Sequence, residues 1–167
     1  MSPLLALFLF LHVMGAIVVF GPSFAFPLIA SQAQKMPQHG HFAAVVSEVI
    51  ERRIIIPGAI VQGITGLILI LLLGVNPLTD APWRWLIPAI ALYLVAILFA
   101  IFVQAKNAEK LVHLTGNIPP GPPPAGAPTG PPPEIVATAR ALQQGGMLLA
   151  VLVVLIVILM VTKPSIG

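Results

Sequence analysis

The chain of 167 residues contains no cysteine. Disulfide bonds, thiolate metal ligands and cysteine nucleophiles are therefore excluded, while the redox compartment stays open. Charged side chains are also scarce, at 8% of the residues, with eight Lys and Arg against five Asp and Glu. Because the basic residues are scattered, the net charge of +3 does not form the basic patch of a nucleic-acid-binding protein. The sequence predicts no nucleic-acid partner.

The usual catalytic combinations are missing as well. The apolar segments contain no pair of carboxylates, and the chain has neither a glycine-rich phosphate loop nor a serine with a base beside it. Enzymatic activity is left open, and the sequence favours a protein that is not an enzyme.

Hydrophobic residues, by contrast, make up 58% of the chain, and the mean hydropathy is +1.04. This composition is typical of an integral membrane protein. Segments long enough to cross a bilayer as helices of about 20 residues are 3–29, 54–73, 83–103 and 147–161, the last needing 141–146 to complete its span. The sequence predicts an all-α fold, a four-helix transmembrane bundle in up-down-up-down order, with residues 1–167 as a single domain.

Basic residues indicate how this bundle is oriented. Arg84 and Lys163 lie on one side of the predicted membrane. The first and third connections, on the other side, carry Lys35, Arg52, Arg53, Lys106, Lys110 and Arg140. We therefore expect a protein of the cytoplasmic membrane with both termini outside and both long connections in the cytoplasm. Trp83 and Trp85 then mark the outer interface.

The helices are expected to extend past the membrane into the cytoplasm. Apolar residues in 42–50 recur at helical spacing, 104–114 contains no helix breaker, and 131–144 opens with prolines suited to a first turn. Residues 118–133 then form a proline-rich cytoplasmic loop. We interpret this loop as an extended linker, with docking of a partner protein as the alternative.

Prolines and glycines interrupt two of the apolar segments. The first segment is expected to be an uncleaved helix rather than a signal peptide, because no basic region precedes its long apolar run. Candidate kinks are Gly21, Pro22 and Pro27 in this helix and Pro57 with Gly58 in the second.

Four polar side chains are predicted to share one depth in the membrane. At about 1.5 Å per residue from the outer face, His12 falls about 13 Å deep, near the midplane of a core about 30 Å thick. The same count places Thr65 at about 12 Å, Gln62 at about 16 Å and Tyr93 at about 15 Å. Three helices thus bring an imidazole, an amide and two hydroxyls to one level.

This layer has two interpretations. Its members can hydrogen-bond across helices, at about 0.5 to 2 kcal/mol per bond, with close approach allowed at Gly58, Gly63 and Gly66. Alternatively, an ionisable residue inside a membrane marks a site, and the imidazole of His12 can ligate haem iron or copper or relay protons. We favour the first interpretation.

The other histidines restrict the second interpretation. A haem b with two histidine ligands needs a second intramembrane histidine, and His39, His41 and His113 all lie in or beyond the cytoplasmic connections. The pair His39 and His41 is a weak candidate metal clamp. Nearby, Glu48 and Glu51 are expected to form ion pairs with basic residues of neighbouring helices, Lys106, Lys110 or Arg140.

Three stretches carry a family resemblance: LHVMGAIVVFGPSF, RRIIIPGAIVQGITGLILILLLG and WRWLIPAIALYLVAILFAIFV. They resemble a bacterial family of predicted four-helix integral membrane proteins of unknown function. That family is distantly similar to the CopD-type copper-resistance and HemJ-type membrane domains, which place a histidine in an early helix. The resemblance implies a role for His12, with Gly15 after it, in haem or copper chemistry.

Three functions follow as hypotheses. The first, which we favour, is a small non-catalytic accessory or scaffold subunit that packs against a larger membrane complex or self-associates in the bilayer. The second is a haem- or copper-linked membrane redox protein that uses His12. The third is a small transporter or proton conduit, although intramembrane charge and paired broken helices, which are typical of transporters, are lacking.

Overall fold

The structure, a computed structural model, describes residues 2–117 and 130–165, and these are helical almost throughout. Four continuous helical rods, each long and apolar enough to cross a membrane, cover Pro3–Lys35, Gly40–Leu73, Ala81–Gly116 and Pro133–Thr162. The all-α prediction with four membrane-crossing helices is confirmed. Each rod also extends beyond its predicted apolar span. Most of the proline-rich loop predicted at 118–133 lies outside the described residues.

Three of the rods are divided by short irregular segments. The first rod consists of α1 (Pro3–Phe20), the 3₁₀ turn η1 (Gly21–Ala25) and α2 (Phe26–Lys35). After the 3₁₀ turn η2 (Pro37–His39), the second consists of α3 (Gly40–Ile50), the π-helical η3 (Glu51–Ile55) and α4 (Ile56–Leu73). The third consists of η4 (Ala81–Trp83), α5 (Leu86–Phe99), the π-helical η5 (Ala100–Gln104) and α6 (Ala105–Gly116). The fourth is α7 (Pro133–Thr162) alone.

Proline accounts for two of the irregular segments. Pro22 lies inside η1, at the first predicted kink. Pro57 has no N–H to donate, and its ring crowds the carbonyl group of Arg53, four residues earlier. The widened turn η3 contains Arg53 and ends just before α4, so the second rod continues through Pro57 without a break. Nothing in the local sequence of η5 explains its π-helical geometry.

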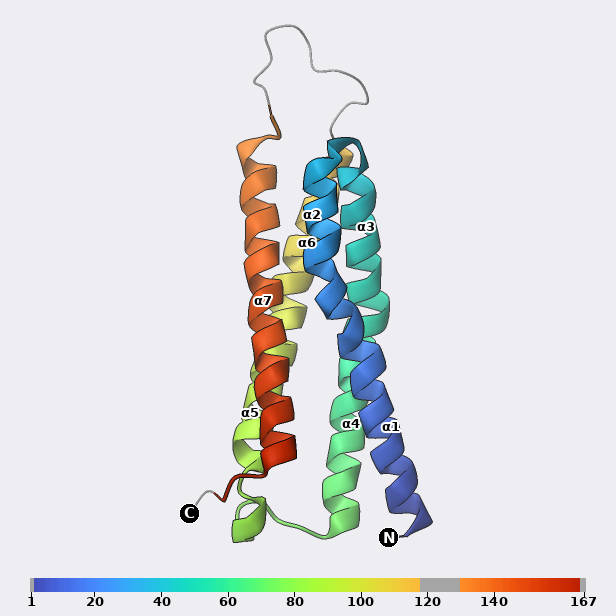
Figure 1. The fold of residues 1–167 in the computed structure, drawn as a ribbon, viewed down its shortest axis with the longest axis vertical. Helices are drawn as coiled ribbons and strands as arrows, with labels where there is room; N and C mark the ends of the chain where they lie inside the picture. The colour runs from blue at the N-terminus through green and yellow to red at the C-terminus, as the bar shows by residue number, and fades with distance from the viewer. Residues whose placement is uncertain (1, 118–129, 166–167) are drawn as a thin grey trace, which may run out of the picture.

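Figure 1 shows both chain ends and the α4–α5 connection at one end of the molecule, with the α2–α3 turn and the start of α7 at the other. Near the chain ends, α1 packs on α4 and α5 packs on α7. Towards the opposite end, α3 packs on α6, and α7 contacts both α6 and α2. The third and fourth rods therefore pair at both ends, whereas the second rod packs on the first rod near the chain ends and on the third towards the opposite end.

Little of this molecule is buried within itself. In the most apolar window of each rod, between 6% and 28% of the residues are buried. Large side chains such as Leu67, Leu71 and Val161 are exposed on the outer faces, as expected where lipid replaces water around a bundle. The apolar surface is thus directed at the bilayer rather than at a central core.

The main apolar cluster lies at the end of α5 nearest the α4–α5 connection. It contains Trp85, Leu86 and Ala89. Trp85 is 5% exposed, so its ring packs within the protein and leaves little surface for contact with lipid headgroups. Trp83 is half-buried, with its ring centroid 6.1 Å from that of Trp85.

Candidate functional site

The predicted polar layer brings His12 of α1 to Thr65 and Gln62 of α4. His12 Nδ1 lies 2.9 Å from Thr65 Oγ1, and Gln62 Nε2 donates a 2.9 Å hydrogen bond to the backbone carbonyl oxygen of His12. Gln62 and Thr65 are both buried, and His12 is half-buried. One turn of α4 thus holds both the ring and the backbone of His12.

The hydroxyl group of Thr65 has one hydrogen and two acceptors within reach, His12 Nδ1 at 2.9 Å and the carbonyl oxygen of Gln62 at 3.0 Å. When it donates to Gln62, it accepts from Nδ1–H of His12. A neutral imidazole with its proton on Nδ1 leaves the lone pair on Nε2. In this tautomer Nε2 is the atom of the ring that can accept a further hydrogen bond or ligate a metal.

The hydroxyl group of Tyr93 does not bond to the other members of the predicted polar layer. It donates a 2.9 Å hydrogen bond to the carbonyl oxygen of Ala59 on α4, rather than to His12, Gln62 or Thr65. Its ring lies against Gly63, where a Cβ atom would clash with the phenol. Tyr93 therefore joins α5 to α4, beside the cluster centred on His12.

Glycines allow these polar contacts to form at short range. A Cβ atom at Gly15 would lie 2.6 Å from Gln62 Oε1, and one at Gly66 would lie 3.2 Å from His12 Cε1. At Gly58 a Cβ atom would clash with the side chain of Val19. Close approach at small residues is how membrane helices bring side chains into contact.

A second histidine is held in the same way at the opposite end of the bundle. His41 Nδ1 of α3 lies 3.0 Å from Thr115 Oγ1 of α6, and Gly116 packs on the His41 ring as Gly66 packs on His12. In both places a histidine ring meets a Thr-Gly pair on another helix. His41 is thus a helix–helix contact, and across residues 2–117 and 130–165 no group of three His, Asp or Glu side chains could hold a metal ion.

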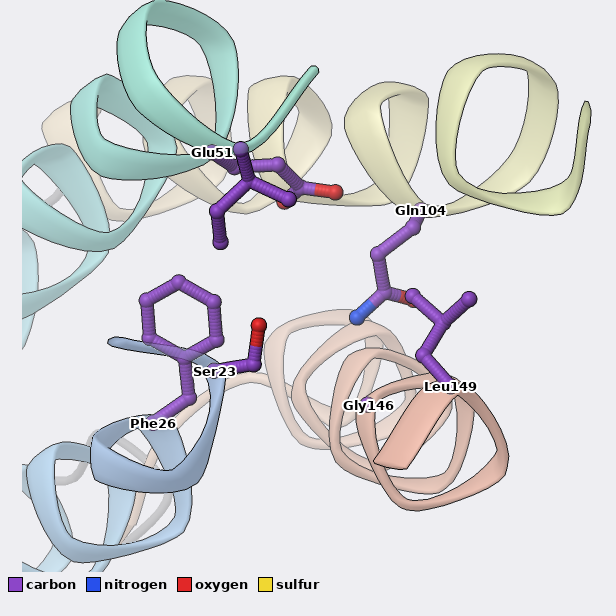
Figure 2. Close-up of a pocket in the computed structure, with 7 residues that line it drawn as sticks. Ser23, Phe26, Glu51, Gln104, Gly146 and Leu149 are labelled. Carbon is purple, nitrogen blue, oxygen red and sulfur yellow. The ribbon is translucent and has the colours of Figure 1, made fainter. Parts of the chain in front are cut away.

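A second polar site, which the sequence did not predict, lies where η1, η3, η5 and α7 meet. Figure 2 shows Glu51, Ser23 and Gln104 around a small cavity. Its volume is about 20 Å³, enough for about one water molecule. Apolar groups, among them Phe26 and Leu149, form the rest of the wall.

Gln104 is 4% exposed and has one side-chain atom without a partner. Its Nε2 donates a 2.9 Å hydrogen bond to the carbonyl oxygen of Leu142 on α7. Its Oε1 has no hydrogen-bond partner among the described residues. The backbone of Gly145 lies against this amide, and a Cβ atom there would clash with Oε1. Gln104 therefore joins the third rod to the fourth and keeps one acceptor unused.

The ion pairs predicted for the acidic residues form in a different arrangement. Glu48 and Glu109 both pair with Arg52, at 2.7 Å and 3.0 Å, and Lys110 pairs with Glu134 at 2.9 Å. Glu51 forms no ion pair within the described parts of the chain and is 5% exposed. The prediction of ion pairing by Glu51 was wrong, because its face of the helix points into the bundle.

The spacing of residues in the sequence indicates that Glu51 and Gln104 point into the bundle. Glu51 shares its buried face with Ile55 and Ala59, four and eight residues later, and Gln104 shares its own with Ala100 and Ala108. A polar residue in line with buried apolar residues at helical spacing is predicted to point inward. The meeting of the two polar side chains, however, depends on how the rods pack.

An apolar groove lies between α1 and α7, on the side of the polar cavity nearer the chain ends. Its volume is about 420 Å³. Its wall consists almost entirely of aliphatic and aromatic side chains, including Ile17, Phe20, Val153 and Val157. The groove is open to the outside of the bundle, so lipid or another apolar chain can enter it.

Comparison with known proteins supports the membrane assignment. Residues 6–164 match a family described as predicted integral membrane protein (DUF2269). Searches among curated proteins and solved structures found no match. The match covers both polar sites and the groove.

Proposed function

The chain belongs to the DUF2269 family of predicted integral membrane proteins, and we propose that it is a small non-catalytic accessory or scaffold subunit. It packs in the cytoplasmic membrane against a larger membrane complex or a second copy of itself. The observation that carries the proposal is the interhelical engagement of His12, Gln62 and Thr65. These groups hold helices together, as His41 does at the other end of the bundle.

The groove between α1 and α7 supports this role. It is apolar and open, and it has a volume of about 420 Å³. A transmembrane helix of another subunit buries its side chains well in such a groove, because packing is a main source of helix association in lipid.

Photo-crosslinking in native membranes tests the proposal. A photoreactive amino acid replaces Ile17 or Val154 in the groove, and Leu71, exposed on α4, is the matched control. We expect a discrete protein adduct from the groove positions and lipid adducts from Leu71. An adduct of twice the chain mass identifies self-association. Lipid adducts alone at all three positions would contradict the proposal.

We also propose that both termini face outside and both long connections face the cytoplasm. The distribution of basic residues supports this orientation. Because the chain has no cysteine, single-cysteine variants report on it without interference. Thr79→Cys, in the α4–α5 connection, is expected to react with an impermeant maleimide in intact cells. Asn117→Cys, after α6, is expected to react only after lysis, and the reverse pattern would invert the orientation.

One observation favours a second candidate, a haem b or copper function at His12. Nδ1 of His12 lies 2.9 Å from Thr65 Oγ1, and in the tautomer whose Nδ1–H donates to this hydroxyl group Nε2 is the free ligand atom, as in many metal-binding histidines. The purified protein would then show a Soret band or bound copper that His12→Ala abolishes. A colourless, metal-free preparation from native membranes excludes this candidate.

A further inference from the structure

Three exposed basic side chains on three different rods take no part in the ion pairs of the described residues. They are Arg53 of η3, Lys106 of α6 and Arg140 of α7. The ion pairs across residues 2–117 and 130–165 use Arg52 and Lys110 instead. The three cations are therefore available to an anionic partner outside the chain.

Each of these side chains is directed away from the bundle. Arg53 lies midway between the buried residues 51 and 55, and Lys106 lies midway between the buried residues 104 and 108. Arg140 comes two residues after the buried Thr138. Two residues correspond to about 200° around a helix, so each cation is on the face of its rod opposite to the buried one.

The three cations also lie at nearly the same level along the bundle. Counted at about 1.5 Å per residue from the last residue of α4, Arg53 lies about 30 Å from the end that carries the chain termini (Figure 1). The same count gives about 34 Å for Lys106 from the last residue of η4, and about 33 Å for Arg140 from the last residue of α7. The hydrocarbon core of a bilayer is about 30 Å thick, so these cations lie where the core meets the headgroups.

The carboxylates that form ion pairs lie at a different level. Glu48, Glu109 and Glu134 fall about 38 to 42 Å from the same end, in the helix extensions, and each is paired within the protein. At the level of the three cations, the described residues include one carboxylate, Glu51, which is 5% exposed and faces the inside of the bundle. The outer surface at this level is therefore positively charged.

The same three faces become apolar towards the chain ends. Phe102, Ile60 and Met147 lie one to two turns from the cations on these faces, and all three are exposed. Long basic side chains at such a border lay their alkyl stems along apolar surface and place the charge among the headgroups. The anion present at this depth of a bilayer is the lipid phosphate, which guanidinium and ammonium groups bind through charge-assisted hydrogen bonds.

We propose that Arg53, Lys106 and Arg140 form a cationic belt that binds the phosphate groups of anionic phospholipids in the leaflet at the α2–α3 end. The belt covers three of the four rods, since residues 23–26 of the first rod, at the same level, carry no charge. Bound headgroups fix the depth of the bundle in the bilayer. The belt is separate from the groove and from His12, and it does not depend on a partner subunit.

Native mass spectrometry of the full-length protein tests the proposal. The protein is reconstituted in vesicles of equal amounts of phosphatidylcholine and phosphatidylglycerol, and the lipids that stay bound after extraction are counted. The belt variant carries Arg53→Gln, Lys106→Gln and Arg140→Gln. The control variant loses the same charge at other levels, through Lys35→Gln, Lys110→Gln and Lys163→Gln. We expect wild type and the control to retain several-fold more phosphatidylglycerol than phosphatidylcholine, and the belt variant to lose this preference.

Two further comparisons separate the belt from other causes. Exchanging Arg and Lys at the three positions (Arg53→Lys, Lys106→Arg and Arg140→Lys) keeps the charge and should keep the preference, whereas each single substitution by Gln should remove part of it. Inorganic phosphate, compared with chloride at equal ionic strength, should not displace phosphatidylglycerol from wild type, and displacement would indicate a free-anion site and overturn the proposal. Equal preferences in wild type and the belt variant, or equal losses in the belt and control variants, would also overturn it.

Discussion

The side-chain amide group of Gln62 donates a hydrogen bond of 2.9 Å to the backbone carbonyl oxygen of His12. Three residues further along α4, Oγ1 of Thr65 lies 2.9 Å from Nδ1 of the same histidine. The first and second rods are thus joined by two bonds to a single residue. Lipid offers no replacement partners when such bonds break, so these contacts are suited to fix the register of α1 on α4.

Thr65→Val is expected to destabilise the bundle. It removes the hydroxyl group that His12 Nδ1 contacts and keeps the shape of the side chain. The free energy of unfolding should fall by about 0.5 to 2 kcal/mol, measured by unfolding in mixed micelles. In the control Thr162→Val, the lost hydroxyl bonds only to Ile158 O of its own helix, and little change is expected. Equal effects of the two substitutions would contradict a special role for Thr65.

Gly58→Ala is expected to separate α1 from α4. The added methyl group clashes with Val19, which is buried, and overpacking of this kind costs about 1 to 3 kcal/mol. At Gly21 an added Cβ has open space within the described structure and a helical backbone. Gly21→Ala is therefore the control, expected to be neutral or stabilising. Thermal melting in detergent compares the two, and a stable Gly58→Ala protein would argue against close packing there.

Trp85→Ala is expected to be the most destabilising of these substitutions. Trp85 is buried against Leu86 and Ala89, and truncating a buried tryptophan costs about 3 to 5 kcal/mol. Trp83 is half-buried, so Trp83→Ala should cost clearly less. Tryptophan fluorescence provides a second check. Trp85, the tryptophan left in Trp83→Ala, should emit at a shorter wavelength than Trp83, the tryptophan left in Trp85→Ala, because it is more deeply buried. The opposite order of stability would place Trp85 at the lipid surface.

Arg52→Gln is expected to have a small effect, although it removes both ion pairs of this residue. The side chain of Arg52 is 53% exposed, and that of Glu109 is 55% exposed. Exposed pairs contribute about 0 to 1 kcal/mol each, and salt screens them. Stability measured at low and high salt should differ less in Arg52→Gln than in wild type. A loss far above this range would indicate that Arg52 also acts on the buried Glu51.

The sequence predicted one polar site better than the other. Counting residues from the predicted membrane surface placed His12, Gln62 and Thr65 at one depth, and the structure brings them together. Tyr93 lies at a similar predicted depth but bonds to Ala59, because depth does not determine the direction of a side chain. The cavity at Glu51 was missed, since ion pairing at an exposed rim was the simpler expectation for a glutamate beside two arginines.

The sequence by itself determined that this chain is helical and that it crosses a membrane. Its long apolar runs cannot leave backbone N–H and C=O groups unpaired in lipid, and a helix satisfies them within the segment. The tertiary structure alone decided which polar groups meet. Whether Glu51 faces Gln104 depends on the rotation of two rods about their axes, and this rotation is set by η3, η5 and the packing at Gly145. Such contacts join residues more than fifty positions apart, and no local pattern specifies them.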